Sequence, residues 1–239
     1  MSYKDSIVAY RSVEKLEEIA KNHLEAYDEG LLESPSETNI TDFIESHLSL
    51  GLLSLPISQD GKTLGYMVFK PTDIAFYQNF GRDKQYLFVD KASVVIDSAL
   101  SDDEKAIGRF RFTCAHEASH WILHRDVIFD GLLSDTDDIL SDKYNHGGQE
   151  NIAEDKRMEW QANYLGAALL MPKEMVKKEF YKMLGVLEIR NRKNLYLDQQ
   201  RCNYIPYKLT INRIANVFKV SEQAARIRLI QLGLLVDDR

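Results

Sequence analysis

Two histidines four residues apart, His116 and His120, enclose Glu117 in a stretch that is otherwise mostly apolar. On an α-helix, residues four apart lie one turn apart on the same face, so both imidazoles can reach one point. Buried imidazoles and carboxylates need polar partners or a metal ion. The chain is therefore limited to folds that bury this helix and place such a partner against it. The apolar neighbours are Phe110, Phe112, Cys114, Ile122 and Leu123.

The histidine pair predicts a zinc site. Imidazole nitrogens bind Zn²⁺ at about 2.0–2.1 Å, and a catalytic zinc takes three protein ligands and keeps one open position. Mn²⁺ is an alternative ion for such ligands. Glu117 lies on another side of the helix, near the ion but not bound to it, where a general base for a water molecule belongs. The motif therefore predicts a metal-dependent hydrolase with Glu117 as its catalytic residue.

A third metal ligand is expected from the second strongly helical stretch, residues 154–170. Glu159 is the preferred candidate, and Asn163, one turn further on, could hydrogen-bond the outer ring nitrogen of a ligand histidine. Three other acidic residues compete with Glu159, and spacing alone separates them only weakly. These competitors are Glu150, Glu154 and Asp155.

Other residues near the motif have two interpretations each. His124 could be a fourth ligand or a substrate contact, but a fourth protein ligand would close the site, so a packed or capping histidine is favoured. His146 could stabilise an oxyanion from a lid, although an ordinary exposed loop histidine is favoured. Cys114 is expected to pack in the core.

The pattern of apolar residues predicts an α+β fold in which a small antiparallel sheet packs on the helix that carries His116 and His120. Short turns between the strands favour an antiparallel meander. Residues 125–156 are polar and acidic and are expected to form a loop or a mobile lid. Helices are expected over 6–27, 42–48, 101–124, 154–170, 172–183 and, as a helix-turn-helix pattern, 209–235; strands are expected over 64–69, 74–77, 86–89 and 94–96.

Charge is distributed unevenly along the 239 residues. Residues 1–172 have 16 Lys and Arg against 30 Asp and Glu, whereas residues 173–239 have 14 against 7. This asymmetry indicates either a basic C-terminal module or two charged surfaces that attract each other. The predicted domains are a metallopeptidase domain over 1–185, including N-terminal helices, and a helical module over 186–239.

The sequence also predicts a soluble, cytoplasmic protein without a membrane partner. Its N-terminus lacks the apolar core of a signal peptide, and its apolar runs are too short to span a bilayer. The two cysteines, Cys114 and Cys202, provide no disulfide framework.

Residues 111–124 (RFTCAHEASHWILH), 159–165 (EWQANYL) and 169–172 (LLMP) together resemble the signature of the ImmA/IrrE family of metallo-endopeptidases. The resemblance implies a zincin-like minimal peptidase core. It also implies that His116, His120 and Glu159 are the metal ligands and that Glu117 is the catalytic acid and base. It thereby raises Glu159 above Glu154.

The same resemblance implies a substrate class. Members of the family cleave helix-turn-helix repressors, often encoded beside them, and so release stress-response, phage or mobile-element genes. The leading prediction is therefore a zinc endopeptidase that cleaves such a repressor. The alternative is a non-catalytic, zinc-containing toxin or sensor module that binds a regulator protein or DNA.

Direct DNA binding by the C-terminal residues is the less favoured hypothesis. The second helix of the predicted helix-turn-helix pattern is rich in Ala, Ile and Leu, and its polar anchors are Arg226 and Arg228. In the family that the chain resembles, such a segment more often braces the peptidase or engages the repressor.

Overall fold

The computed structural model describes residues 8–79, 82–102, 106–129, 151–190, 193–198 and 200–238. The chain divides into two compact units, Met1–Leu16 with Asn39–Gly166, and Glu17–Thr38 with Ala167–Arg239. The division falls inside helices α1 (Val13–Tyr27) and α6 (Asn151–Leu170), so each unit contains part of both helices. The second unit thus also takes in residues on the N-terminal side of the predicted boundary at residue 185, and the two predicted domains stay a prediction.

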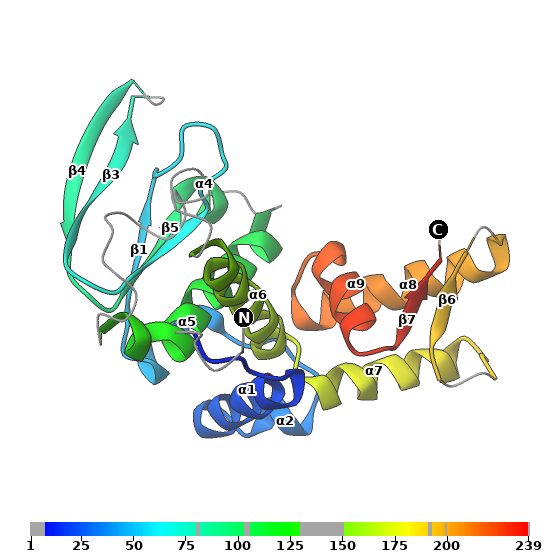
Figure 1. Cartoon of the computed structure of the whole chain (residues 1–239). Coiled ribbons are helices and arrows are strands. Elements are labelled where there is room, and N and C mark those ends of the chain that lie inside the picture. The colour runs from blue at the N-terminus through cyan, green and yellow to red at the C-terminus, as the bar shows by residue number, and fades with distance from the viewer. Residues whose placement is uncertain are drawn as a thin grey trace. The chain divides into compact units, whose positions relative to one another are not determined.

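The first unit contains a three-stranded sheet of order β1-β5-β2 (Figure 1). β1 (Gly51–Leu55) runs parallel to β5 (Ser93–Asp97), with Leu53 opposite Val95, and β2 (Gly65–Val68) runs antiparallel to β5. β3 (Thr72–Gln78) and β4 (Asp83–Val89) form a separate antiparallel hairpin between β2 and β5 in the chain.

The predicted antiparallel meander is therefore wrong: the sheet is mixed. The expectation failed because the sequence pattern predicted no strand over residues 51–55, and this strand pairs in parallel with β5. The hairpin β3–β4 leaves the sheet instead of extending it, so β5 returns between β1 and β2. The sheet and the hairpin share one apolar cluster, which comprises Ile57, Val68, Ile74, Val89 and Val95.

The long helix α5 (Ile107–Phe129) packs on β2 and β5 of this sheet. At the start of β2, a Cβ on Gly65 would lie 2.9 Å from Cγ2 of Thr113 in α5 and 3.1 Å from the carbonyl oxygen of Val95 in β5. A larger residue would push the helix away from the strand, so glycine permits the close contact. The remaining helical elements of this unit are α3 (Ile40–Asp42), the π-helical turn η2 (Phe43–His47) and α4 (Ser98–Ser101).

The predicted helix boundaries shift at several points. The helix expected over 6–27 begins at Val13, and the helix expected from residue 101 begins at Ile107. The serine at 101 instead ends the short α4, whose N-terminus is capped by the Asp97 side chain accepting from the backbone N–H of Ala99. The stretch over 125–156 that was expected as a loop is helical at both ends, because α5 continues to Phe129 and α6 begins at Asn151; its remaining residues, 130–150, lie outside the described residues.

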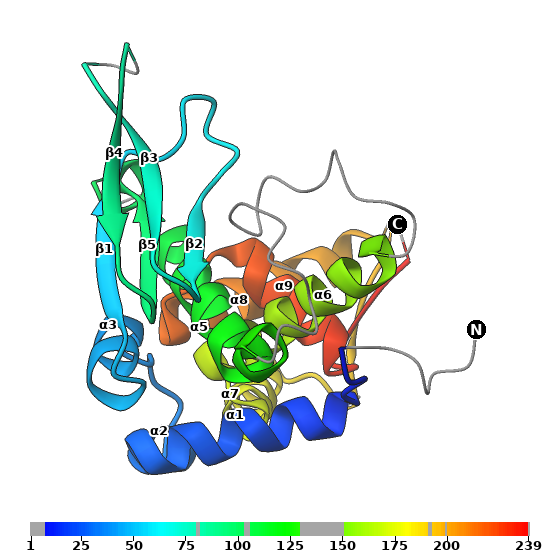
Figure 2. The same cartoon turned by 60° about the vertical axis from the view of Figure 1, so that its left-hand side comes forward.

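The second unit is mainly helical (Figures 1 and 2). At the start of α9 (Glu222–Gln231), the side chain of Ser221 accepts a hydrogen bond from the backbone N–H of Ala224 and so caps the helix. The short strands β6 (Leu195–Leu197) and β7 (Leu235–Asp237) pair in parallel and were not predicted. Besides its parts of α1 and α6, the second unit contains the helices α2 (Gly30–Glu33), α7 (Lys173–Val186), α8 (Arg201–Phe218) and α9 (Glu222–Gln231). Among the helices described for the chain, none has the length and apolar character needed to cross a membrane.

Candidate metal centre

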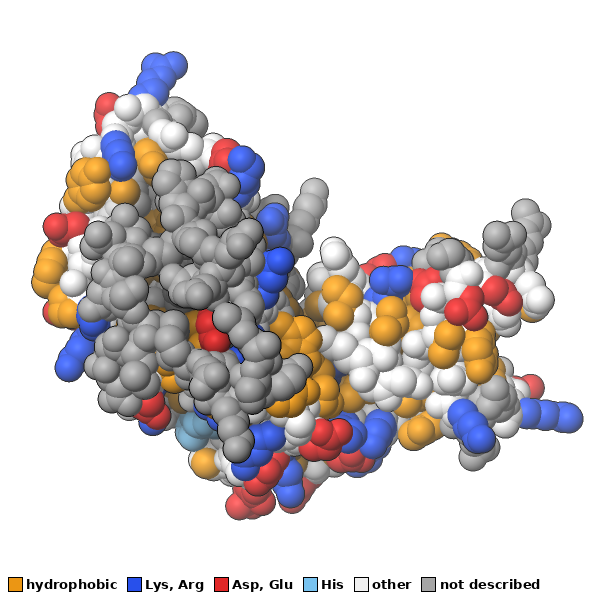
Figure 3. Space-filling view, in the orientation of Figure 1, with side chains coloured by type: hydrophobic (Ala, Val, Ile, Leu, Met, Phe, Trp, Pro, Cys, Tyr) orange, Lys and Arg blue, Asp and Glu red, His pale blue; other side chains and the backbone are white. Residues whose placement is uncertain are grey.

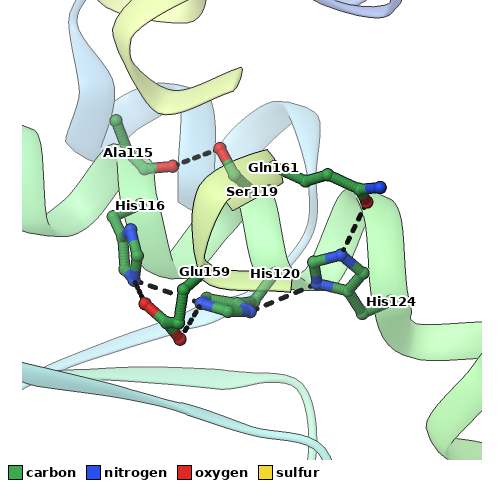
Figure 4. A network of polar contacts seen from close by, with 7 residues as sticks. All are labelled: Ala115, His116, Ser119, His120, His124, Glu159 and Gln161. Carbon is green, nitrogen blue, oxygen red and sulfur yellow. Dashed lines mark hydrogen bonds and ion pairs between the residues drawn. The ribbon is translucent and has the colours of Figure 1, made fainter. Parts of the chain in front are cut away.

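Helices α5 and α6 bring three side chains to one point (Figure 4). The Nε2 atoms of His116 and His120 lie 3.1 Å apart. The carboxylate of Glu159 in α6 places Oε2 at 3.3 Å from Nε2 of His116 and Oε1 at 3.2 Å from Nε2 of His120. The structure thus brings together the three residues that the sequence predicted as metal ligands.

These separations fit a tetrahedral ion. Ligand atoms about 2.0–2.1 Å from a tetrahedral zinc lie roughly 3.3–3.4 Å from one another. The three observed separations are within about 0.3 Å of that value, with one carboxylate oxygen of Glu159 facing each histidine. Two imidazole nitrogens with one carboxylate is a donor set that suits a divalent transition metal ion.

The close approach of the two helices depends on a small residue. A Cβ on Gly166 of α6 would lie 3.1 Å from the backbone nitrogen of His116 and 3.3 Å from the carbonyl oxygen of Ala115. Glu159 lies seven residues earlier, on the same face of α6, because seven residues make about two helical turns. The fully buried Ala162 lies between them on that face. Small residues there let α6 bring the Glu159 carboxylate within reach of the two imidazoles.

The electrostatics of the cluster favour positive charge at its centre. Burial works to lower the pKa of His116, but the hydrogen bond with Glu159 and the negative charge of Glu117 raise it above its ordinary value. Burial works to raise the pKa of Glu159, but hydrogen bonds with His116 and His120 outweigh it and hold that pKa well below the usual range. A site with these properties stabilises a proton or a metal cation.

Glu117 lies beside this cluster but outside it. Its side chain is buried, and that burial raises the pKa of its carboxyl group. The neighbouring imidazoles of His116 and His120, and a hydrogen bond from the backbone of Met67 in β2, act in the opposite direction. This is the arrangement that the sequence predicted for a base: near the three ligands, without being one of them.

Two of the three competing third ligands, Glu154 and Asp155, are described by the structure and lie outside the cluster. Glu154 accepts a hydrogen bond from the backbone N–H of Val8 at 2.9 Å and lies 3.6 Å from the guanidinium of Arg157. Neither Glu154 nor Asp155 belongs to the cluster of ligand atoms. Glu150 and His146 lie outside the described residues.

His124 and Cys114 are both buried on α5. Nδ1 of His124 lies 3.2 Å from Nδ1 of His120, and its Nε2 lies 3.2 Å from Oε1 of Gln161 in α6 (Figure 4). Burial, with the neighbouring His120, lowers the pKa of His124 to about 3, so this residue is neutral. Burial, with the charge of Glu117, raises the pKa of the Cys114 thiol to about 12, which agrees with a packing role.

The supporting role predicted for Asn163 stays a prediction. Its exposed side chain helps to raise the pKa of His116. Nδ1 of His116 is nevertheless buried without a hydrogen-bond partner in the part of the chain that the structure describes. The outer nitrogen of His120 is instead hydrogen-bonded with His124, a contact that the sequence did not predict.

Sequence comparison identifies the family. The model of the M78 peptidase family, described as the IrrE N-terminal-like domain, matches residues 79–230, which is well over half of the chain. The chain belongs to this family of metallopeptidases, and its resemblance to the ImmA/IrrE proteins is confirmed. No curated protein sequence matches the chain.

Proposed function

We propose that this protein is a metal-dependent endopeptidase. The proposal is carried by one observation: the Nε2 atoms of His116 and His120 lie 3.1 Å apart with a carboxylate oxygen of Glu159 within 3.3 Å of each, and the buried carboxyl group of Glu117 lies beside them. Zn²⁺ is the preferred ion, and the sheet with α5 and α6 is proposed to be a zincin-like core. A structural zinc site would have no use for Glu117, which favours catalysis over a non-catalytic module.

The chain's own residues have separate tasks in the proposed reaction. An ion held by the cluster would supply Lewis-acid polarisation of a carbonyl group and would acidify water. His116, His120 and Glu159 hold and orient that ion. Glu117 takes the proton from the attacking water and returns it to the nitrogen of the departing amine. Burial of Glu117 excludes bulk water from this proton transfer.

The proposed substrate is a helix-turn-helix repressor, the class that the resemblance to the ImmA/IrrE proteins implies, and membership of the family supports this proposal. Helices α8 and α9 are proposed to form a helix-turn-helix-like module that braces the peptidase or engages this substrate. Direct DNA contact through α9 has little support. Arg228 is fully buried, and Arg226 is paired with Asp237. On the face drawn in Figure 3, the described Lys and Arg side chains around α8 and α9 are scattered among apolar and acidic ones.

The experiment incubates the zinc-loaded protein with purified helix-turn-helix repressors encoded near its gene and maps the products by mass spectrometry. The matched control is Glu117→Gln, which is isosteric and leaves the three ligands in place. We expect a repressor to be cut at a defined bond by the wild type and to remain intact with the variant. Equal cleavage by both proteins would remove Glu117 from the mechanism. Stable binding of a repressor without cleavage by either would favour the regulator-binding alternative.

A further inference from the structure

His120 is the ligand histidine whose second nitrogen is also engaged. Its Nε2 faces the metal cluster, and its Nδ1 lies 3.2 Å from Nδ1 of His124. His124 in turn places Nε2 at 3.2 Å from Oε1 of Gln161. All three side chains are buried, so water does not substitute for these contacts. Figure 4 shows them as one continuous line from Glu159 to Gln161.

The hydrogen bond at the Gln161 end of this line determines which atoms donate and which accept along it. Nε2 of Gln161 donates to the backbone carbonyl of Ala9 at 2.9 Å. A carbonyl oxygen can only accept, so the NH₂ group of Gln161 must face Ala9. Its Oε1 therefore faces His124, and an amide oxygen can also only accept.

The protons on both histidines then follow in sequence. Because Oε1 of Gln161 accepts, Nε2 of His124 must carry a hydrogen. A neutral imidazole has one N–H, so Nδ1 of His124 is an acceptor and Nδ1 of His120 must donate to it. The hydrogen of His120 is thereby held on Nδ1. Its Nε2, which faces His116 and Glu159, takes no part in this line and is the atom that can lose its hydrogen and bind a metal ion.

We propose that His124 and Gln161, anchored on the carbonyl of Ala9, are positioning residues that hold His120 in its metal-binding tautomer. The inference rests on the proposed metal site and adds residues to it that the motif does not contain. His124 is not a fourth ligand, because Nδ1 faces His120 and Nε2 faces Gln161. A ligand histidine whose outer nitrogen is fixed in this way is better oriented and more basic.

The anchor at Ala9 is itself held in place by both helices of the site. The backbone N–H of Val8 donates to Glu154 at 2.9 Å, and its carbonyl accepts from Arg157 at 2.8 Å. Arg11 donates to the carbonyl of Leu123 in α5 at 3.1 Å. The segment Val8–Arg11 is thus bound to α5 and α6 on both sides of Ala9. These contacts explain how a segment far from the motif in sequence can fix the orientation of His120.

The test compares zinc affinity in variants of the line with one control on the same helix. His124→Phe keeps the ring size but leaves Nδ1–H of His120 without an acceptor, and Gln161→Leu removes the link to Ala9. His124→Asn is the rescue variant, because its Oδ1 can accept from His120. Ser119→Ala is the control: Ser119 is buried beside His120, but its hydroxyl donates to the carbonyl of Ala115 and is outside the line.

We expect the zinc dissociation constant, measured by competition with a chromogenic chelator, to rise about 10- to 100-fold in His124→Phe and Gln161→Leu. It should change less than about threefold in Ser119→Ala and recover substantially in His124→Asn. Circular dichroism and thermal melting of each metal-free variant check that the fold is retained. Unchanged zinc affinity in both line variants, with the fold retained, would overturn the proposal.

A second measurement is independent of the metal. Nitrogen-15 NMR of the metal-free protein distinguishes the two tautomers of a histidine ring. We expect Nδ1 of His120 to carry a hydrogen in the wild type and to lose that preference in His124→Phe. A wild-type His120 without a hydrogen on Nδ1 would refute the proposed line. If the expected tautomer is found but zinc does not bind, the metal site fails and the line stands; if zinc binds without cleavage, only the proposed peptidase activity fails.

Discussion

Two partly buried polar clusters in this protein each contain a glutamate, and they differ in the balance of donors and acceptors. In the second unit, Arg228 is fully buried and donates to both carboxylate oxygens of Glu17, at 2.8 and 2.9 Å. Its Nε donates to the carbonyl of Met171 at 3.0 Å. In the other unit, the ion-pair partners that the described part of the chain gives to Glu159 are the imidazole nitrogens of His116 and His120.

The difference separates a structural contact from a ligand site. The Arg228 cluster contains its own cation, so it is complete within the protein. The Glu159 cluster brings together a carboxylate and two nitrogen lone pairs, so it is completed by a proton or an ion. Burial alone does not tell these clusters apart, whereas the donor count does.

The largest effect is expected at Glu117, whose carboxyl group lies beside the Glu159 cluster without belonging to it. Glu117→Gln should lower the rate of repressor cleavage by about 10²- to 10⁴-fold, the usual contribution of a general base. Bound zinc should be unchanged, because the ligands remain. Single-turnover cleavage assays and elemental analysis on the same preparations measure both quantities. Loss of zinc together with activity would mean that Glu117 helps to hold the ion.

Removing Arg228, the cation that pairs with Glu17, should destabilise the fold and leave metal binding intact. Arg228→Met strands Glu17 in a buried position and should lower the free energy of unfolding by about 3–5 kcal/mol. Urea unfolding followed by circular dichroism measures this loss. The double variant Glu17→Leu with Arg228→Met should regain part of it, because no uncompensated charge remains. A single variant as stable as the wild type would show that the pair is not a closed structural contact.

Zinc bound by His116, His120 and Glu159 should stabilise the fold. At a free zinc concentration about 100-fold above the dissociation constant, binding should add about 2.7 kcal/mol to the free energy of unfolding. Melting curves with zinc and with excess chelator measure the shift. Glu159→Ala should show almost no shift, whereas Arg228→Met should show the full shift from a lower baseline. An equal zinc shift in Glu159→Ala would place the ion elsewhere.

The smallest effect is expected at Cys114, a potential metal-binding side chain that lies near the histidines but is buried among apolar residues. Cys114→Ala should leave the zinc content unchanged and reduce the free energy of unfolding by about 1 kcal/mol. Elemental analysis and urea unfolding provide the two values. A loss of zinc in this variant would add a thiolate to the ligand set and change the geometry proposed here.

The local parts of the site could be predicted from sequence, because helical periodicity fixes them. The four-residue spacing of His116 and His120 predicted their convergence, and it holds at 3.1 Å between the Nε2 atoms. Glu154 and Glu159 are five residues apart and so point about 140° apart around α6. Periodicity could show that only one of them reaches the cluster, but not which one, because that depends on how α6 packs on α5.

The parts that could not be predicted depend on contacts between distant residues. The strand over 51–55 pairs in parallel with residues 93–97, and parallel pairing across such a separation leaves no short-range turn signal. The line from His120 through His124 and Gln161 to Ala9 joins three separate segments of the chain. Each of these residues alone has an ordinary structural interpretation, and only their arrangement in space gives them a shared role.

The most direct test of the account is the metal content of the wild type, Glu159→Ala and Glu154→Ala, measured by elemental analysis after dialysis against zinc. Glu154 is the matched control, since it lies on the same helix and is hydrogen-bonded to Val8 instead of the histidines. We predict about one zinc per wild-type chain, the same amount in Glu154→Ala and almost none in Glu159→Ala. A wild-type chain without zinc, or zinc retained in Glu159→Ala and lost in Glu154→Ala, would contradict the proposed metal centre.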